Sequence, residues 1–314
     1  MKTIRFTLIS ESDSVPISVM ACLPEDKKPE AFLQIAHGMC GCKERFLPFM
    51  KYMADHGIAC VANDHRGHGA SVRSEDDLGF MYDGGGEALV DDMVRVTSWI
   101  HKSFPDIPVC LLGHSMGSMA ARVYAQKYDD LIDGLILSGI PSWNPFSYIA
   151  YLLTGAVSFL GGGRIRPAFI SDLVSGLYNR RFSSEGPRAW TCSDPAVRRA
   201  FAKNPRCNYV FTMNGMHGLM ALMIMSYKNY GWDVHNPEMP VFFISGEDDP
   251  CKRNEDMFHK AALDMCRHGY HNVTSALYGG MRHEILNEKE KESVWKDILI
   301  FVETKKGLVK QIHK

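Results

Sequence analysis

The sequence Gly113-His114-Ser115-Met116-Gly117 sets a serine between two glycines, directly after a short apolar run and directly before an alanine-rich segment. In a nucleophile elbow the serine occupies a strained strand-to-helix turn, and small residues two positions before and after it let strand and helix approach closely. A strand over residues 109–112 and a helix over 116–128 are expected on either side. A glycine-rich helix start is the alternative interpretation, but the flanking pattern favours the elbow and predicts Ser115 as a nucleophile.

A serine hydroxyl becomes reactive only when a base takes its proton and a third group orients that base. In elbow-type sites the acid and then the histidine follow the serine along the chain. Residues 246–250, Gly-Glu-Asp-Asp-Pro, come directly after an apolar run and supply the acid. Asp249 is favoured over Asp248 because a residue just beyond the turn can point back at the site. His283, after the strand expected at 273–278 and a Gly-Gly pair, is the predicted base.

The tetrahedral intermediate of acyl transfer needs two hydrogen-bond donors for its oxyanion. We predict the backbone N–H of Met116, which follows the nucleophile, and that of Met39, in the loop after the apolar run 31–36. The same loop contains His37, Cys40 and Cys42, which can also be interpreted as metal ligands. No second cysteine or histidine pair at zinc-finger spacing follows them, so we predict His37 as a structural hydrogen-bonder, with no metal and no cofactor.

Short apolar runs recur along the chain, and helix-like stretches separate the early ones. This pattern is typical of buried parallel strands joined by crossover helices. Two N-terminal segments, 3–10 and 15–23, alternate in polarity and predict a hairpin. The pattern stops at Pro141 and resumes at Pro240. We therefore predict an α/β fold with a mostly parallel central sheet, a core formed by residues 1–140 and 238–314, and an inserted helical cap at 141–237.

The composition is that of an ordinary globular protein, with 46% hydrophobic and 23% charged residues among 314. Lys and Arg number 35 against 36 Asp and Glu, so the chain lacks the basic excess that nucleic-acid binding needs. Nine scattered cysteines predict reduced thiols. The N-terminus lacks the apolar run of an export signal, and the longest apolar stretch, 146–160, is shorter than a membrane-spanning helix. These features predict a cytoplasmic protein.

The cap differs from the rest of the chain in charge and in apolar pattern. Residues 141–238 contain ten Lys or Arg and five Asp or Glu, an excess that is either a solvated face or an attraction to anionic lipid or a phosphorylated headgroup. Between Met213 and Met223, methionines recur at helical spacing. They either pack against the core or line a binding surface for an acyl chain. The apolar segment 143–160 is the candidate for a second wall of the substrate site. It is also the candidate for transient contact with a membrane surface. The candidate substrate-binding residues are Met213, Met216, Met220, Trp143 and Phe146.

Together these motifs resemble the α/β-hydrolase superfamily, and within it the monoacylglycerol lipase and lysophospholipase group, also described as serine aminopeptidase-like. The matching stretches are residues 37–39, 63–71, 113–117, 246–250 and 282–288. In that family the acid lies three residues after the glycine of the Gly246 position, which is Asp249 here. The resemblance implies a serine hydrolase that cleaves lipid-like esters through an acyl-enzyme on Ser115. One departure is residues 39–43, Met-Cys-Gly-Cys-Lys, where the family often has a Gly-x-Gly-Glu-His-like run.

Other functions share the same catalytic residues. A peptidase or amidase would need a site for a free amine, and the cap has no obvious acidic cluster for it. A catalytically silent binding protein would keep the pocket, but the complete triad argues against it. A metal-free haloperoxidase-like activity would use the same three residues. The sequence therefore favours an esterase or lipase acting on a small, lipid-like ester.

Overall fold

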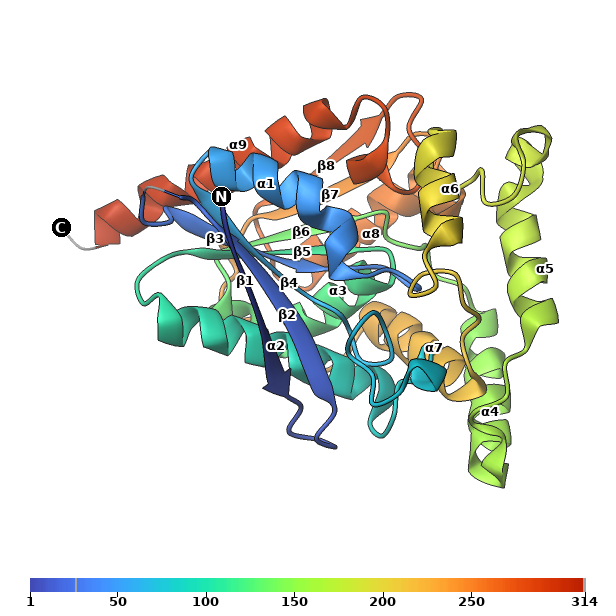
Figure 1. Ribbon diagram of the computed structural model, residues 1–314. Coiled ribbons are helices and arrows are strands. Elements are labelled where there is room, and N and C mark those ends of the chain that lie inside the picture. Colours follow the sequence, from blue (N-terminus) through green and yellow to red (C-terminus); the bar gives the residue numbers. More distant parts are fainter. Residues whose placement is uncertain (26, 313–314) are drawn as a thin grey trace.

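The centre of the molecule is a sheet of eight strands in the part of the chain that the structure describes. This computed structural model describes residues 1–25 and 27–312, and side chains as far as residue 304. The strands are β1 (Lys2–Ile9), β2 (Pro16–Leu23), β3 (Ala31–Ala36), β4 (Ile58–Asn63), β5 (Val109–His114), β6 (Gly134–Ser138), β7 (Val241–Gly246) and β8 (Val273–Tyr278). Their order across the sheet is β1-β2-β4-β3-β5-β6-β7-β8 (Figure 1). The β1–β2 and β2–β4 pairs are antiparallel and the pairs from β4 to β8 are parallel, which confirms the predicted mostly parallel sheet.

The strands in the middle of the sheet are buried on both faces. Every residue of β3, β4, β5 and β6 is buried. Parallel strands that are covered by helices on both faces need apolar side chains at nearly every position, which is why these segments form continuous apolar runs in the sequence. Strand β1 instead alternates between exposed and partly buried residues, because it is the edge strand of the N-terminal hairpin.

Helices cover the sheet on both faces. One face packs against α1 (Leu47–Asp55) and α9 (Lys291–Ile312), and the other packs against α2 (Gly85–Ser103), α3 (Met116–Tyr128) and α8 (Glu255–Arg267). Figure 1 shows these layers, with α1 and α9 above the sheet and α2 below it. The result is a three-layer α/β arrangement with one hydrophobic core on each side of the sheet.

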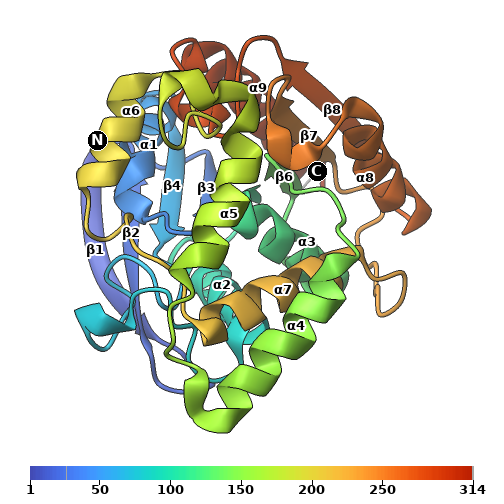
Figure 2. The same ribbon diagram turned by 90° about the vertical axis from the view of Figure 1, so that its right-hand side faces the viewer.

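The chain between β6 and β7 forms a helical insertion. It contains α4 (Phe146–Val157), a π-helical turn (Ser158–Gly162), α5 (Ala168–Asn179), α6 (Pro195–Lys203) and α7 (Met213–Tyr227). Among the described residues it adds no strand to the sheet. Figure 2 views these helices face on, with α4 and α7 beside each other and α5 in front of the sheet. We refer to residues 141–237 as the cap.

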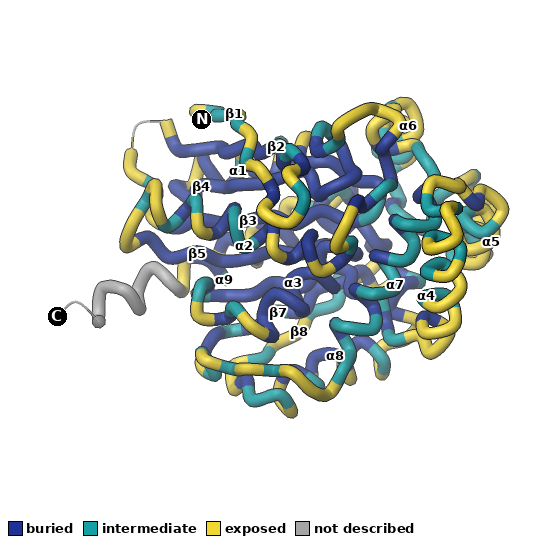
Figure 3. The backbone as a smooth tube through the Cα atoms, turned by 90° about the horizontal axis from the view of Figure 1, so that it is seen from below, coloured by how far each residue is buried: buried dark blue, intermediate teal, exposed yellow. Residues whose placement is uncertain are grey.

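The outer helices of the cap expose an apolar surface, which we call the α4–α5 face. Its large side chains are exposed to solvent, including Phe159 at 91% and Leu160 at 83%. Figure 3 shows the contrast between these exposed helices and the buried strands. The other members of the face are Phe146, Ile149, Leu152, Leu153, Phe169, Leu173 and Leu177. Within the described residues, helices that combine enough length and apolarity to cross a bilayer do not occur.

Candidate active site

Ser115 lies at the turn between β5 and α3. Its backbone has φ 55° and ψ −117°, a region that residues other than glycine rarely adopt, and its N–H donates to the carbonyl oxygen of Ser138 over 2.9 Å. The flanking glycines permit this close packing. A Cβ on Gly117 would overlap the carbonyl oxygen of Ala36, and a Cβ on Gly113 would overlap the backbone of Gly117. The serine therefore has the strained strand-to-helix geometry of a nucleophile elbow.

Three side chains from separate loops form one hydrogen-bonded chain. The Ser115 hydroxyl donates to Nε2 of His283 over 2.8 Å, and Nδ1–H of His283 donates to Oδ2 of Asp249 over 2.9 Å. Asp249 follows β7, and its carboxylate also accepts from the N–H of Cys251 at 2.8 Å and from the hydroxyl of Ser245 at 2.9 Å. This network orients the imidazole so that its unprotonated Nε2 faces the serine. The arrangement can transfer a proton from the serine to the histidine.

The electrostatics of the buried pair support that proton transfer. Burial alone lowers the pKa of His283, but the charge of Asp249, the hydrogen bond to it and the neighbouring Cys251 together outweigh burial and raise this pKa well above its usual value. Burial alone raises the pKa of Asp249, whereas attraction to His283 and the hydrogen bonds that the carboxylate accepts bring it below the usual value. Asp249 is therefore ionised at neutral pH and stabilises the imidazolium that forms when His283 accepts a proton.

Asp248, the other carboxylate in this turn, has a different partner. It forms an ion pair with Arg181 of the cap at 2.7 Å, and its N–H donates to the carbonyl oxygen of Met281 over 2.9 Å. Its side chain is partly exposed, while that of Asp249 is fully buried. Of the two adjacent carboxylates, Asp249 is the one that bonds to His283.

The loop after β3 lies directly against the nucleophile. A Cβ on Gly38 would lie 3.0 Å from the Cβ of Ser115, so glycine is needed for this approach. Within the described part of the chain, the backbone N–H groups of Met39 and Met116 donate no hydrogen bond, and both residues line the cavity at Ser115. Two unused donors on either side of a nucleophile can stabilise the oxyanion of a tetrahedral intermediate.

His37, Cys40 and Cys42, the alternative metal ligands in this loop, have separate partners. The Nδ1–H of His37 donates to the carbonyl oxygen of Gly38 over 2.8 Å, and its Nε2 accepts from the N–H of His65 over 3.0 Å. Burial holds the pKa of His37 well below its usual value, so the ring is neutral, as this donor and acceptor pattern requires. Cys40 and Cys42 contact groups of the cap instead. His37 is therefore a structural hydrogen-bonder, as predicted.

Two other groups of side chains have donor atoms close enough to share a metal ion among the described residues. They are Asp249, Cys251 and His283, and Asp129, Asp130 and His235. In the first group, Asp249 and His283 already bond to each other. In the second, Asp129 accepts hydrogen bonds from the backbone N–H of His235 and from the hydroxyl of Tyr270. Hydrogen bonds within the chain therefore account for Asp249 in the first group and for Asp129 in the second.

The loop that contains His283 is attached to the cap. The N–H of Glu284 donates to the carbonyl oxygen of Thr191 over 2.7 Å. Arg282 forms an ion pair with Glu185 of the cap at 2.6 Å and donates to a neighbouring cap carbonyl. The position of the histidine therefore depends on the cap as well as on the sheet.

A cavity of about 730 Å³ opens onto Ser115. Its walls come from α4, α5 and α7 of the cap and from the loops after β3 and β5. Most of the lining is apolar, as is usual for a small-molecule site of this size. The apolar side chains of the cap that line it include Phe146, Leu153, Val157, Ile170, Val174, Met213, Met216, Leu219, Met220 and Met223.

Most of the predicted substrate-binding residues line this cavity, namely Phe146, Met213, Met216 and Met220. Trp143 does not, which corrects its assignment. Its ring packs against those of Tyr148 and Tyr227, with centroids 5.5 and 5.9 Å apart. The preceding residue, Ser142, lines the cavity and donates its hydroxyl to the carbonyl oxygen of Lys252 over 2.6 Å.

The sequence interpretation missed a charged pair in the cavity wall. Glu284 accepts two hydrogen bonds from the guanidinium of Arg45, at 2.9 and 2.5 Å. Burial alone raises the pKa of Glu284, but the charge and hydrogen bonds of Arg45, together with the nearby His114 and His283, outweigh burial and lower this pKa to about 2. Glu284 directly follows His283, and Arg45 lies shortly after the Met39 loop. In the sequence, only these positions connect Glu284 and Arg45 with the site. Neither position indicates that the two side chains contact each other.

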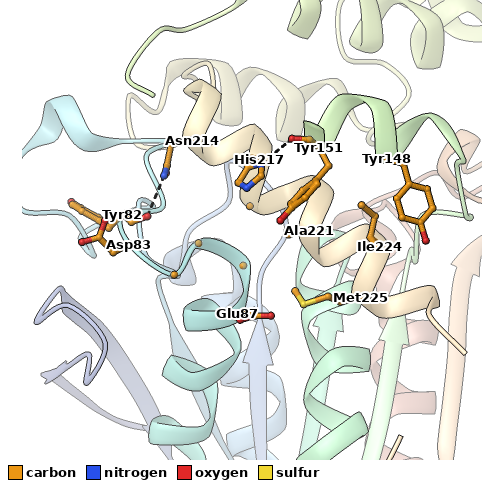
Figure 4. A pocket seen from close by; sticks show the side chains of 14 residues that line it. Tyr82, Asp83, Glu87, Tyr148, Tyr151, Asn214, His217, Ala221, Ile224 and Met225 are labelled. Carbon is orange, nitrogen blue, oxygen red and sulfur yellow. Dashed lines mark hydrogen bonds between the residues drawn. The ribbon is translucent and has the colours of Figure 1, made fainter. Parts of the chain in front are cut away.

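A second cavity, of about 550 Å³, is lined by other residues of α7 than those that line the cavity at Ser115. Figure 4 shows this second cavity. Asn214 donates to the carbonyl oxygen of Tyr82 over 3.2 Å, and His217 bonds to that of Tyr151 over 3.0 Å. These bonds connect α7 to the core and to α4. Ser115, Asp249 and His283 are not part of this lining, so the second cavity is separate from the catalytic arrangement. Its α7 residues include His217, Ala221, Ile224 and Met225.

Comparisons with known proteins agree with this architecture. Residues 27–290 match the family described as serine aminopeptidase, S33. A monoglyceride lipase homolog of monkeypox virus is 32% identical over 284 residues, which cover 88% of this chain and 89% of that protein. The monoacylglycerol lipase of Mycolicibacterium smegmatis is 22% identical over 281 residues, which again cover 88% and 89%. A thermostable carboxyl esterase from Bacillus coagulans, solved in complex with glycerol, aligns with a TM-score of 0.87 at 23% identity, covering 98% of this chain and 99% of that one.

The structural likeness confirms the predicted α/β-hydrolase fold, and the sequence matches confirm the resemblance to the monoacylglycerol lipase group. The protein is thus a carboxylic ester hydrolase. With 264 consecutive positions matched, from 27 to 290, the chain belongs to the serine aminopeptidase S33 family of α/β-hydrolases.

Proposed function

We propose that this enzyme hydrolyses lipid-type carboxylic esters through an acyl-enzyme on Ser115. The observation that carries the proposal is the hydrogen-bonded chain from Ser115 through His283 to Asp249, which opens onto an apolar cavity. Fluorophosphonate labelling and kinetics of a Ser115 variant test the mechanism. A series of esters with different acyl lengths tests the substrate class.

In the proposed mechanism, Ser115 Oγ attacks the ester carbonyl carbon while its proton moves to Nε2 of His283. The N–H groups of Met39 and Met116 stabilise the oxyanion. As the tetrahedral intermediate collapses, His283 donates the proton to the leaving alcohol oxygen, and the acyl group stays on Ser115. Water then repeats the sequence: His283 takes its proton, the hydroxyl attacks the acyl carbon, and the proton returns to Ser115 as the carboxylic acid leaves. Asp249 keeps the imidazole oriented throughout.

The apolar wall formed by α4, α5 and α7 is proposed to hold the acyl chain. Burial of apolar surface contributes roughly 25 cal/mol per Å², so a long chain gains more binding free energy from this wall than an acetyl group does. Monoacylglycerol- or lysophospholipid-type esters have the required combination of one long chain and a small polar alcohol. The relatives named monoglyceride and monoacylglycerol lipase support this substrate class.

The double substitution Met216→Ser with Met220→Ser is expected to raise KM for a long-chain ester about tenfold and to change acetyl ester kinetics less than about twofold. The reason is that these methionines contact only the distal part of a long chain and leave the reacting atoms untouched. The measurement is kcat and KM on acetyl and long-acyl esters of the same alcohol.

A matched control is Ile224→Ser with Met225→Ser, because these residues lie on α7 but line the second cavity. This control is expected to behave like the wild type on both esters. Equal losses on both esters in the Met216 and Met220 variant, with the fold intact, would mean that these methionines are simply packed core and that the acyl chain lies elsewhere.

A peptidase of the aminopeptidase type is less well supported by the cavity. Recognition of a free substrate amine needs an available carboxylate in the site. Among the described residues that line the cavity, the carboxylate is that of Glu284, and Arg45 already occupies both of its oxygens. The ester proposal needs no such group.

We also propose that the α4–α5 face contacts a lipid surface, since its apolar side chains adjoin the cavity wall and are exposed. The substitution Phe159→Ser with Leu160→Ser is expected to weaken association with phospholipid vesicles about tenfold or more, because each side chain loses its apolar burial in the interface. Vesicle co-sedimentation measures this. A control, Leu263→Ser with Ile300→Ser, removes exposed aliphatic side chains from α8 and α9 and is expected to bind as the wild type does. Equal binding by all three proteins would contradict the proposal.

A further inference from the structure

The cavity at Ser115 contains a positive charge that no carboxylate of the described residues neutralises. Among its described lining residues, the guanidinium groups are those of Arg45 and Arg188. Both lie over the ring of Phe201, each with its central carbon 4.7 Å from the ring centroid. Arg45 is paired with Glu284, whereas Arg188 has no carboxylate partner among the described residues. The Arg188 guanidinium donates a long hydrogen bond, of 3.4 Å, to the amide oxygen of Asn208.

The backbone holds Arg188 at the cavity in an unusual conformation. Its φ is 57°, in the left-handed region that a side chain such as arginine rarely adopts. Thr191 donates both its N–H and its hydroxyl to the carbonyl oxygen of Arg188, over 3.0 and 2.9 Å. The next residues are also bonded, since Arg282 donates to the carbonyl oxygen of Ala189 over 2.7 Å. Residues held in such conformations by their surroundings are concentrated at ligand-binding sites.

The charge of Arg188 acts on the same end of the cavity as the oxyanion loop. Burial raises the pKa of the Cys40 thiol to about 12, and the positive charge of Arg188 opposes that rise. The geometry agrees, because Arg188 and Arg45 lie over the same Phe201 ring and Arg45 bonds to Glu284, the residue after His283. Two residues after Arg188, the ring of Trp190 lies 5.2 Å from that of His283, so Arg188 is near the reacting end of the cavity. The lining therefore divides into an apolar part for an acyl chain and a polar part with an unpaired cation.

We infer that Arg188 binds a phosphate group in the alcohol part of the substrate, so that the enzyme prefers lysophospholipid-type esters over neutral monoacylglycerols. This inference rests on the proposed function. A planar guanidinium matches two phosphate oxygens, and charge-assisted hydrogen bonds of this kind are roughly twice as strong as those between neutral groups. Phosphate supplies the anion that Arg188 lacks, whereas an uncharged glycerol leaves it unpaired.

The test compares a 1-acylglycerol with its 3-phosphate, both with the same acyl chain and both below their micellar concentrations. For the wild type we expect a higher kcat/KM on the phosphate ester. In Arg188→Gln, the ratio of the two kcat/KM values is expected to fall about 10- to 100-fold, mainly through KM of the phosphate ester, because a charge-assisted bond is lost. Arg188→Lys keeps the charge and is expected to restore part of the ratio.

Arg199→Gln is the matched control, because Arg199 is an exposed cap arginine on α6 that does not line the cavity. It removes the same charge from the cap and is expected to leave the ratio unchanged. Thermal unfolding followed by circular dichroism checks that each variant is folded. An unchanged ratio in Arg188→Gln, or a ratio that falls equally in Arg199→Gln, overturns the inference.

Inorganic phosphate separates two sources of the ligand. If millimolar phosphate inhibits neutral ester hydrolysis by the wild type but not by Arg188→Gln, the site binds free phosphate as well as the headgroup. If it does not inhibit while the ratio still depends on Arg188, the phosphate must be part of the lipid. Failure of the proposed function gives a different result: the wild type then hydrolyses neither ester and is not labelled by a fluorophosphonate.

Discussion

Replacement of Ser115 by alanine is expected to lower ester turnover by about 10⁴-fold or more and to abolish covalent labelling by a fluorophosphonate. The hydroxyl is the group that bonds to His283 Nε2, and the strained backbone at the elbow directs it into the cavity. Without it the acyl-enzyme cannot form. Mass spectrometry of the labelled protein and steady-state kinetics with a soluble ester measure the two effects.

Ser226→Ala is a suitable control for this experiment. Ser226 is buried on α7 and its hydroxyl donates to the carbonyl oxygen of Met223 over 3.0 Å, but it does not line the catalytic cavity. The control is expected to keep both labelling and turnover. Labelling that persists in Ser115→Ala would assign the nucleophile to another residue.

Asp249→Asn is expected to reduce kcat by about 10³- to 10⁴-fold, because the amide no longer holds the imidazole in the tautomer that accepts the serine proton. Asp248→Asn, the adjacent control, is expected to cost less than about tenfold, since Asp248 pairs with Arg181 and not with His283. Steady-state kinetics on one soluble ester compares the two variants. The reverse order of effects would identify Asp248 as the orienting acid.

The same substitution should also move the pH profile. His283 must be neutral to accept the serine proton, so wild-type kcat/KM rises as the pH increases through the pKa of His283, which lies above its ordinary value of about 6.5. Asp249→Asn removes the charge that raises this pKa and leaves burial, which lowers it. The acidic limb of the residual activity should therefore shift to lower pH. A limb that stays in place would show that another group controls it.

The strands and the elbow were predictable from the sequence because their causes are local. A buried parallel strand needs a continuous apolar run, and the run at 31–36 coincides with β3 while the run at 109–112 lies within β5. The elbow needs small residues where strand and helix touch, and the overlap that a Cβ on Gly117 would cause explains that requirement. The order of serine, acid and histidine follows from the order of strands in the sheet.

The lining of the cavity was less predictable because it depends on tertiary contacts. Helix α7 is apolar on nearly all sides and separates two cavities, so its composition does not reveal which methionines face Ser115. Trp143 and Phe146 lie close together in the sequence, yet Phe146 lines the cavity while Trp143 packs against the rings of Tyr148 and Tyr227. Arg45 and Glu284 meet only after the chain has folded, since they are separated by 239 residues.

The insertion between β6 and β7 is also expected to determine when the enzyme becomes active during folding. Ser115 precedes the insertion, whereas Asp249 and His283 follow it, so the pairing of β6 with β7 must bring distant halves of the chain together. Closing a loop as long as residues 139–240 costs on the order of 4 kcal/mol of chain entropy before the strand contacts compensate for it. Non-local parallel pairing of this kind is slow compared with the formation of helices and hairpins. Recovery of ester hydrolysis during refolding therefore reports completion of this long-range step, and not the earlier collapse of either half.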